Sequence, residues 1–463
     1  MKSTLLERKF SLEKEEITIE QLTILLIVML LLLLIIILLP DKGNSLKILS
    51  PQFGFVACFI PGVIYAYQYI DKWNLILAWP TVFFIIYGLL VFVLFSYITS
   101  YVYDELTLSK NVLFYNRIQY DNINYKIENW KIKFLVFLEL LSLLLTIIFL
   151  VKNYGANLSQ AIFTYRSSVS NGLTSDNTLP SFVKVLRRIA LSSGYIVMYL
   201  LLNGIVYKIN RNRFWEYICV ILAILNGFML GGRGDGIQLI IAALVQYIAL
   251  RYSSKNSKGI PIKSILIATF VIILLFCSFI QLGELLGRQM DFLNFNDYIG
   301  VYMSAELKNF DIFVNSGQIG HPISQSLTLY NIINSLGGIL SIPSWIHPFD
   351  IPYRYYGNYA LGNVGTIFYP FVYDAGLLGV ILYTMVMAIL CQVLYKKFLV
   401  SNKFCDISIS FIFYSYMFYI IIFSFFSNKF YEMIFNTAFL WTFVSWIIVK
   451  FFLLNVKYNN NLN

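Results

Sequence analysis

Long apolar runs recur along the chain of 463 residues, separated by short polar connections. Each run is long enough to cross the roughly 30 Å hydrocarbon core of a bilayer as an α-helix. The first run is too long for a cleaved signal peptide and no small-residue cleavage site follows it, so we expect it to remain as a membrane helix. The pattern predicts about eleven membrane helices, near residues 21–39, 52–70, 79–101, 133–151, 186–206, 215–230, 236–250, 264–282, 366–394, 409–427 and 433–455.

Composition supports the same class of protein. With 59% hydrophobic and 13% charged residues, and a mean hydropathy of +0.71, the chain is too apolar for a soluble protein of its length. No internal repeat or soluble domain interrupts the pattern. We expect an all-α polytopic integral membrane protein with about 11–12 transmembrane helices, forming a single transmembrane domain over residues 1–463.

The net charge of +10 predicts an orientation in the membrane and not a nucleic-acid partner. The positive-inside rule places short basic connections in the cytoplasm. The turn that carries Arg233 and the large loop at 281–361 then face outward. Eleven spans put residues 1–20 outside although they are basic, so either the N-terminus is external or one more span exists. The basic connections lie at 104–133, 208–213, 251–263 and 395–403.

The motifs of soluble enzymes are missing from the sequence. It contains no Walker loop, no GxSxG and no HExxH, its five cysteines show no CxxC spacing, and its two histidines make a poor metal site. We expect neither a metal nor a cofactor.

The stretch "GGRGDGIQ" places an arginine on a glycine-rich turn between two apolar runs. Asp235 followed by Gln238 has a spacing that marks a helix start, which makes Asp235 a candidate cap. The surrounding glycines, among them Gly232 and Gly234, allow positive φ and close approach of the backbone to a ligand. A guanidinium beside a helix N-terminus suits an anion such as a diphosphate. The alternative is a tight turn in which Arg233 extends to the lipid headgroups.

Aromatic residues crowd the end of the large loop, at 343–380. Most of these rings fit a membrane-interface belt, although aromatic faces also stack on sugars. His347, Asp350 and Arg354 lie among them and could act on a lipid-linked anion. Each could equally be a solvated loop residue.

These features together resemble the bacterial oligosaccharide repeat-unit polymerases, the Wzy-type polymerases of O-antigen and capsular polysaccharide. The resemblance rests on the glycine-arginine turn at 226–240, on "NVGTIFYPFVYDAGLLGVILY" and the residues around it at 358–385, and on the long outer loop. It implies a GT-C-like membrane glycosyltransferase in the bacterial cytoplasmic membrane, with its active site facing outward. It also implies transfer of a glycan from undecaprenyl diphosphate to a sugar hydroxyl of the next lipid-linked unit, without a metal or cofactor. Expected partners are the lipid-linked oligosaccharide, membrane lipid, a chain-length regulator and a flippase.

The resemblance assigns tasks to particular residues. Arg233, with Gly232 and Gly234, matches the family's turn and takes the role of binding the diphosphate, where negative charge develops on the leaving group. Three more arginines match only by lying in outer segments: Arg166, Arg288 and Arg354. Attack by a sugar hydroxyl needs a base, for which His347 and Asp350 are the candidates, His347 first because imidazole exchanges protons near neutral pH.

Two other functions compete with the polymerase. An O-antigen ligase shares the architecture but transfers the finished glycan to a lipid A core. A lipid-linked oligosaccharide flippase would place charges inside its spans around a cavity. Few charges occur within the predicted spans, Glu139 and Asp374 among them, which favours a transferase over a transporter.

Overall fold

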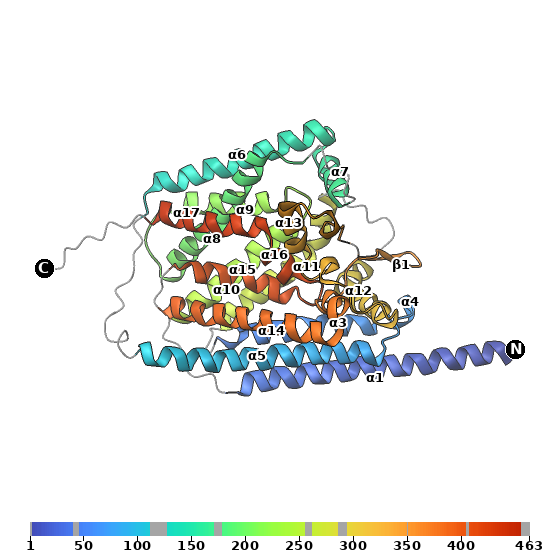
Figure 1. The fold of residues 1–463 in the computed structure, drawn as a ribbon. Helices are drawn as coiled ribbons and strands as arrows, with labels where there is room; N and C mark the ends of the chain where they lie inside the picture. Colours follow the sequence, from blue (N-terminus) through green and yellow to red (C-terminus); the bar gives the residue numbers. More distant parts are fainter. Residues whose placement is uncertain are drawn as a thin grey trace. The chain divides into compact units, whose positions relative to one another are not determined.

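The structure is a computed structural model that describes residues 2–39, 46–111, 127–170, 178–254, 262–285, 294–349, 351–403 and 407–454. In these residues the chain is almost entirely helical, with one antiparallel pair of short strands (Figure 1). The longer helices are α1 (Lys2–Leu38), α5 (Trp79–Asn111), α6 (Asn129–Tyr154), α8 (Ser181–Val206), α10 (Gly234–Ser254), α11 (Ile262–Leu285), α12 (Phe295–Asn315) and α14 (Phe368–Lys403).

Shorter elements connect these helices or pack between them. They are α2 (Pro51–Ala57), α3 (Phe59–Tyr67), α4 (Ile70–Trp73), α7 (Leu158–Ser170), α9 (Phe214–Phe228), α13 (Tyr330–Leu340), α15 (Ile409–Ile422), α16 (Lys429–Ile434) and α17 (Thr437–Leu453), the 3-10 turns η1 (Lys47–Leu49), η2 (Ile323–Gln325) and η3 (Pro343–Trp345), and the strands β1 (Arg354–Tyr356) and β2 (Tyr359–Gly362).

Six helices in the described part of the chain are long and apolar enough to cross a membrane. They are Glu15–Leu38, Trp79–Thr107, Asn129–Tyr154, Ser181–Val206, Gly234–Ser253 and Phe368–Ser401. The other five predicted runs coincide with shorter apolar helices, at Pro51–Tyr67, Phe214–Phe228, Ile265–Leu274, Ile409–Ile422 and Thr437–Leu453. The prediction of an all-helical, multi-pass membrane protein is confirmed.

Helix α6 shows how such a helix meets lipid. Its polar residues Glu139, Ser142 and Thr146 follow one another at helical spacing and are completely buried, whereas Leu140 and Leu144 are exposed. A helix of a soluble protein has the opposite arrangement. A polar stripe turned inward and an apolar surface turned outward are the arrangement that hydrocarbon requires.

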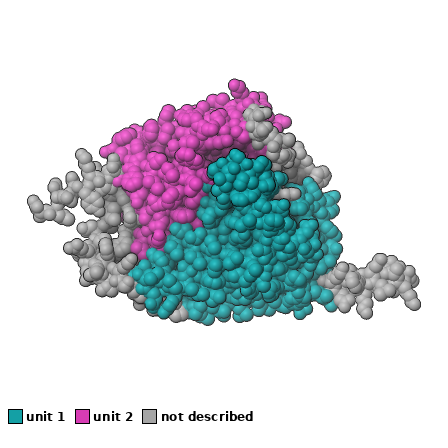
Figure 2. Space-filling model, in the orientation of Figure 1, with its two compact units in different colours: residues 1–114, 291–396, 420–436 teal, residues 115–290, 397–419, 437–463 magenta. Residues whose placement is uncertain are grey.

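The chain divides into two compact units, which Figure 2 colours separately. Unit 1 contains residues 1–114, 291–396 and 420–436. Within it α12 packs against α3, α5 and β2. Glycine permits the close approach of α3 to α12, because a Cβ on Gly62 would lie 2.7 Å from the carbonyl oxygen of Met303.

Unit 2 contains residues 115–290, 397–419 and 437–463. Helix α8 contacts α6, α9, α10 and α17, and every residue from 190 to 201 is buried. A helix buried on all sides belongs to the interior of a helical bundle. Helix α8 approaches α9 closely at Gly194, where an added Cβ would lie 2.5 Å from the Cβ of Ala223.

The connection at 281–361, expected as a large loop, contains regular structure. It contributes α12, α13 and the β1–β2 hairpin to unit 1. The low hydropathy of the α12 segment predicts an exposed polar loop. In the structure, however, Glu306, Asn309 and Asp311 are each at most 4% exposed. The segment is a helix whose polar side chains point into protein.

Candidate anion-binding site

The glycine-arginine turn joins α9 to α10 inside unit 2. Gly231 has a φ of 73°, a conformation that favours glycine, and a Cβ there would lie 2.9 Å from Cγ2 of Ile162 on α7. Of the glycines expected to provide positive φ, Gly231 alone does so. Gly232 is exposed, with no atom within 4 Å of an added Cβ, and Gly234 is the first residue of α10.

Helix α10 begins two residues earlier than a cap at Asp235 predicts. Because the helix begins at Gly234, Asp235 lies in its first turn and is not its cap. Gln238 does not complete a capping box, since its Nε2 donates to the carbonyl oxygen of Tyr416 at 3.2 Å. A carboxylate in the first turn still interacts favourably with the positive end of the helix dipole.

Arg233 is 6% exposed. A side chain that extended along the surface to reach headgroups would keep its guanidinium in water, so the low exposure favours an enclosed role over snorkelling. Arg166 on α7 donates from Nη1 to the carbonyl oxygen of Gly231. The structure therefore brings two of the predicted substrate-binding arginines to the same turn.

Two further arginines, on α8, belong to this region and were not among the predicted site residues. Arg187 is 5% exposed, and its Nη1 has no hydrogen-bond partner among the described residues. Its charge interacts with Asp235 and with its neighbour Arg188. The signal was present in the sequence: two adjacent arginines within a predicted span, at 186–206, mark a functional position.

We refer to Arg166, Arg187, Arg188 and Arg233 as the arginine group. Each guanidinium presents several N–H donors in a planar fork that matches the oxygens of a phosphate. The first N–H groups of α10 add donors that no carbonyl within the helix can accept. A buried charge without a full set of partners is costly, and an anion at Arg187 would remove that cost.

His347 lies in unit 1, in the segment that follows η3. Its backbone is held by Asn334, which donates to its carbonyl oxygen at 2.9 Å and accepts from its N–H at 3.3 Å. Nδ1 donates to the carbonyl oxygen of Pro348 at 3.1 Å, while Nε2 is buried without a partner among the described residues. In the neutral ring this arrangement leaves the lone pair on Nε2, where a base would need it.

The remaining predicted residues are placed as follows. Arg354 begins β1 and pairs with Gly362 across the hairpin of unit 1. Asp350 and Arg288 lie outside the described residues. Arg166 is joined to the turn of Arg233 by its hydrogen bond to Gly231.

Comparison with protein-family models, curated proteins and solved structures finds no match to the chain. The candidate site therefore rests on its own geometry and charge.

Proposed function

We propose that this protein is a membrane glycosyltransferase of the GT-C type that polymerises oligosaccharide repeat units carried on undecaprenyl diphosphate. In this reaction the bond between the anomeric carbon and the diphosphate breaks, and a glycosidic bond forms to a hydroxyl of the next unit. The hydroxyl proton passes to a base, and the lipid diphosphate leaves. The reaction takes place on the outer side of the bacterial cytoplasmic membrane, with eleven helices crossing it.

The arginine group is the observation that supports this proposal most. A diphosphate leaving group gains negative charge as its bond breaks, and fixed donors aimed at that charge lower the barrier. Arg187 supports the assignment because its Nη1 is enclosed by protein and unpaired within the described residues. The N–H groups of such a nitrogen can donate to the oxygens of a bound anion.

His347 is the residue we propose as the base. Its ring contacts Tyr330 edge-on, with centroids 5.4 Å apart, and its backbone is fixed by Asn334, so Nε2 has a defined direction. Asp350 is the alternative base. The two are compared through polymer length in His347→Ala and Asp350→Ala at matched expression, and full-length polymer from both variants would place the base elsewhere.

Elongation by the purified protein tests the proposed reaction. The protein, in lipid nanodiscs, would be given lipid-diphosphate-linked repeat units and no nucleotide sugar, with and without a chelator. We expect products that grow by whole repeat units, at equal rates in both arms. Transfer only to an added lipid A core acceptor would identify a ligase, and no transfer at all would contradict a transferase function.

A further inference from the structure

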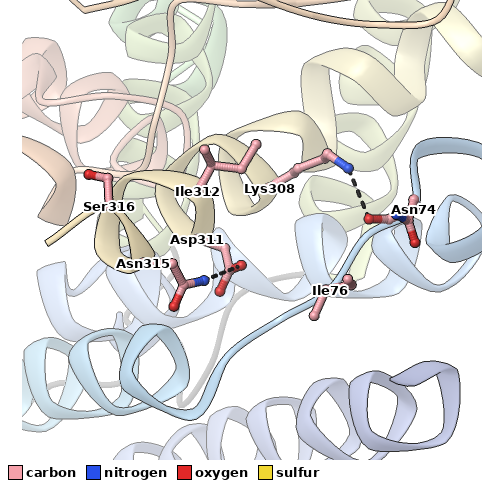
Figure 3. Close-up of a pocket in the computed structure, with 7 residues that line it drawn as sticks. All are labelled: Asn74, Ile76, Lys308, Asp311, Ile312, Asn315 and Ser316. Atoms are coloured by element: carbon pink, nitrogen blue, oxygen red, sulfur yellow. Dashed lines mark hydrogen bonds between the residues drawn. The ribbon is translucent and has the colours of Figure 1, made fainter. Parts of the chain in front are cut away.

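A pocket of about 370 Å³ lies beside α12 in unit 1 (Figure 3). Its volume falls within the range of small-ligand sites, roughly 300–1,000 Å³. Asn74 and Ile76 come from the segment between α4 and α5, and the other lining residues come from the C-terminal half of α12 and from Ser316, which follows it. Those residues are Lys308, Asp311, Ile312, Asn315 and Ser316.

Asp311 supplies an oriented carboxylate to this pocket although it is only 4% exposed. Oδ1 accepts hydrogen bonds from the backbone N–H of Ala78 at 2.7 Å and from the hydroxyl of Thr81 at 2.6 Å. Oδ2 accepts from Nδ2 of Asn315 at 2.9 Å. A carboxylate has about four acceptor positions, so one remains on Oδ2 for a ligand.

Lys308 supplies a positively charged hydrogen-bond donor to the pocket and is also buried, at 7% exposure. Its ammonium donates to the carbonyl oxygens of Trp73 and of Asn74, the latter at 3.0 Å. An ammonium has three donors, so a third can serve a ligand. The amide of Asn315 adds one more acceptor and one more donor, because only one of its N–H groups is used by Asp311.

One tyrosine of the β1–β2 hairpin, Tyr356 on β1, lies against Lys308. The ring of Tyr356 is centred 4.2 Å from Nζ of Lys308. The side chain of Tyr356 is itself exposed. Exposed aromatic faces pack well against the C–H faces of a sugar ring, since each ring is large, rigid and partly polar.

We propose that this pocket binds an uncharged sugar of a glycan. A sugar offers hydroxyl groups that both donate and accept, and the pocket presents an ammonium, a carboxylate and an amide on about two successive turns of α12. An anionic ligand suits it less well, because Asp311 would repel it. The inference assigns a second ligand site, in a different unit from the arginine group, and it holds whether or not the chain polymerises glycans.

Saturation-transfer NMR with small glycosides tests the proposal. The whole protein in nanodiscs would be mixed with the methyl glycosides of glucose, galactose, N-acetylglucosamine and rhamnose, which carry neither lipid nor diphosphate. We expect saturation of the ring protons of at least one glycoside, unchanged by inorganic phosphate. Asp311→Asn and Asn315→Ala should weaken binding at least about fivefold, the order of magnitude of one lost hydrogen bond.

Asn315→Ala keeps the test decisive if Asp311→Asn does not fold, because Asn315 is exposed. Asn153→Ala is the matched control, since Asn153 is also an exposed helical residue whose amide donates to a group four positions earlier. No saturation by any glycoside, or equal saturation of wild type and Asn315→Ala, would overturn the proposal. An intact glycoside signal without elongation would count against the polymerase alone.

Discussion

Nη1 of Arg166 donates a hydrogen bond to the carbonyl oxygen of Gly231. This contact ties α7 to the turn between α9 and α10, 65 residues further along the chain. It holds the backbone two residues before Arg233, which is enclosed at 6% exposure. An arginine that binds a diphosphate needs such support, because a site loosens when the residues around it are not themselves held in place.

The two neighbouring glycines of the turn should respond differently to a methyl group. Gly231→Ala forces alanine into positive φ, which costs about 1–2 kcal/mol, and brings its Cβ to 2.9 Å from Ile162. Gly232→Ala meets no atom within 4 Å. We expect a lower unfolding temperature for the first variant and an unchanged one for the second. Equal unfolding temperatures would contradict the geometry of the turn.

The membrane helices were predictable because a long apolar run needs no partner elsewhere in the sequence to be recognised. Helix α12 was not. Its Asp297 is paired with Lys72 at 2.7 Å, a partner 225 residues earlier. Such a partner compensates part of the cost of burying a carboxylate, and hydropathy along the chain cannot detect it.

The sequence predicted Arg233 as a residue of the candidate site but did not predict Arg187. Arg233 stood out because the sequence places it on a glycine turn between two apolar runs. Arg187 lies on a different helix, and its link to the turn runs through Asp235. Only the packing of α8 against α10 brings them together.

Replacing Arg187 with an apolar residue should separate stability from activity. A buried guanidinium with an unpaired nitrogen lowers the stability of the protein without ligand, and functional sites often carry such a cost. Arg187→Met should therefore unfold at the wild-type temperature or higher, yet elongate lipid-linked units much more slowly. The measurement is thermal unfolding beside an elongation rate. A variant that is less stable and fully active would show that Arg187 is a structural residue.

The orientation in the membrane can be tested at two exposed positions, 210 and 318. The basic connection at 208–213 is predicted to be cytoplasmic and the segment around 318 to face outward. In a cysteine-free background, an impermeant maleimide added to intact cells should label Gln318→Cys at once. Asn210→Cys should react only after the membrane is opened. The reverse pattern would invert the topology and move the turn of Arg233 to the cytoplasm.

Lys308 should make stability depend on alkaline pH. Burial lowers the pKa of its ammonium to about 8, against a weaker opposing effect of the Asp311 charge, whereas the unfolded chain has the ordinary value of about 10.4. Between these values the unfolded state binds more protons, so the free energy of unfolding gains a contribution that rises with pH. Below about pH 8 that contribution is constant.

The comparison of wild type with Lys308→Met isolates this contribution from other titrating groups. We expect the free energy of unfolding of wild type to rise relative to the variant between about pH 8 and about pH 10. Parallel curves over that interval would show that Lys308 keeps its ordinary pKa in the folded protein.

The rate of elongation in variants of Arg233 tests the central claim most directly. Losing a group that stabilises developing charge costs about 3 kcal/mol or more, on the order of a hundredfold in rate. Arg233→Ala should slow elongation by that factor at normal abundance, and Arg233→Lys should also be impaired, because lysine lacks the planar fork. Arg251→Ala, at the opposite end of α10, is the matched control and should elongate normally. If Arg233→Ala elongates lipid-linked units at the wild-type rate, the arginine group does not bind the diphosphate and the account is wrong.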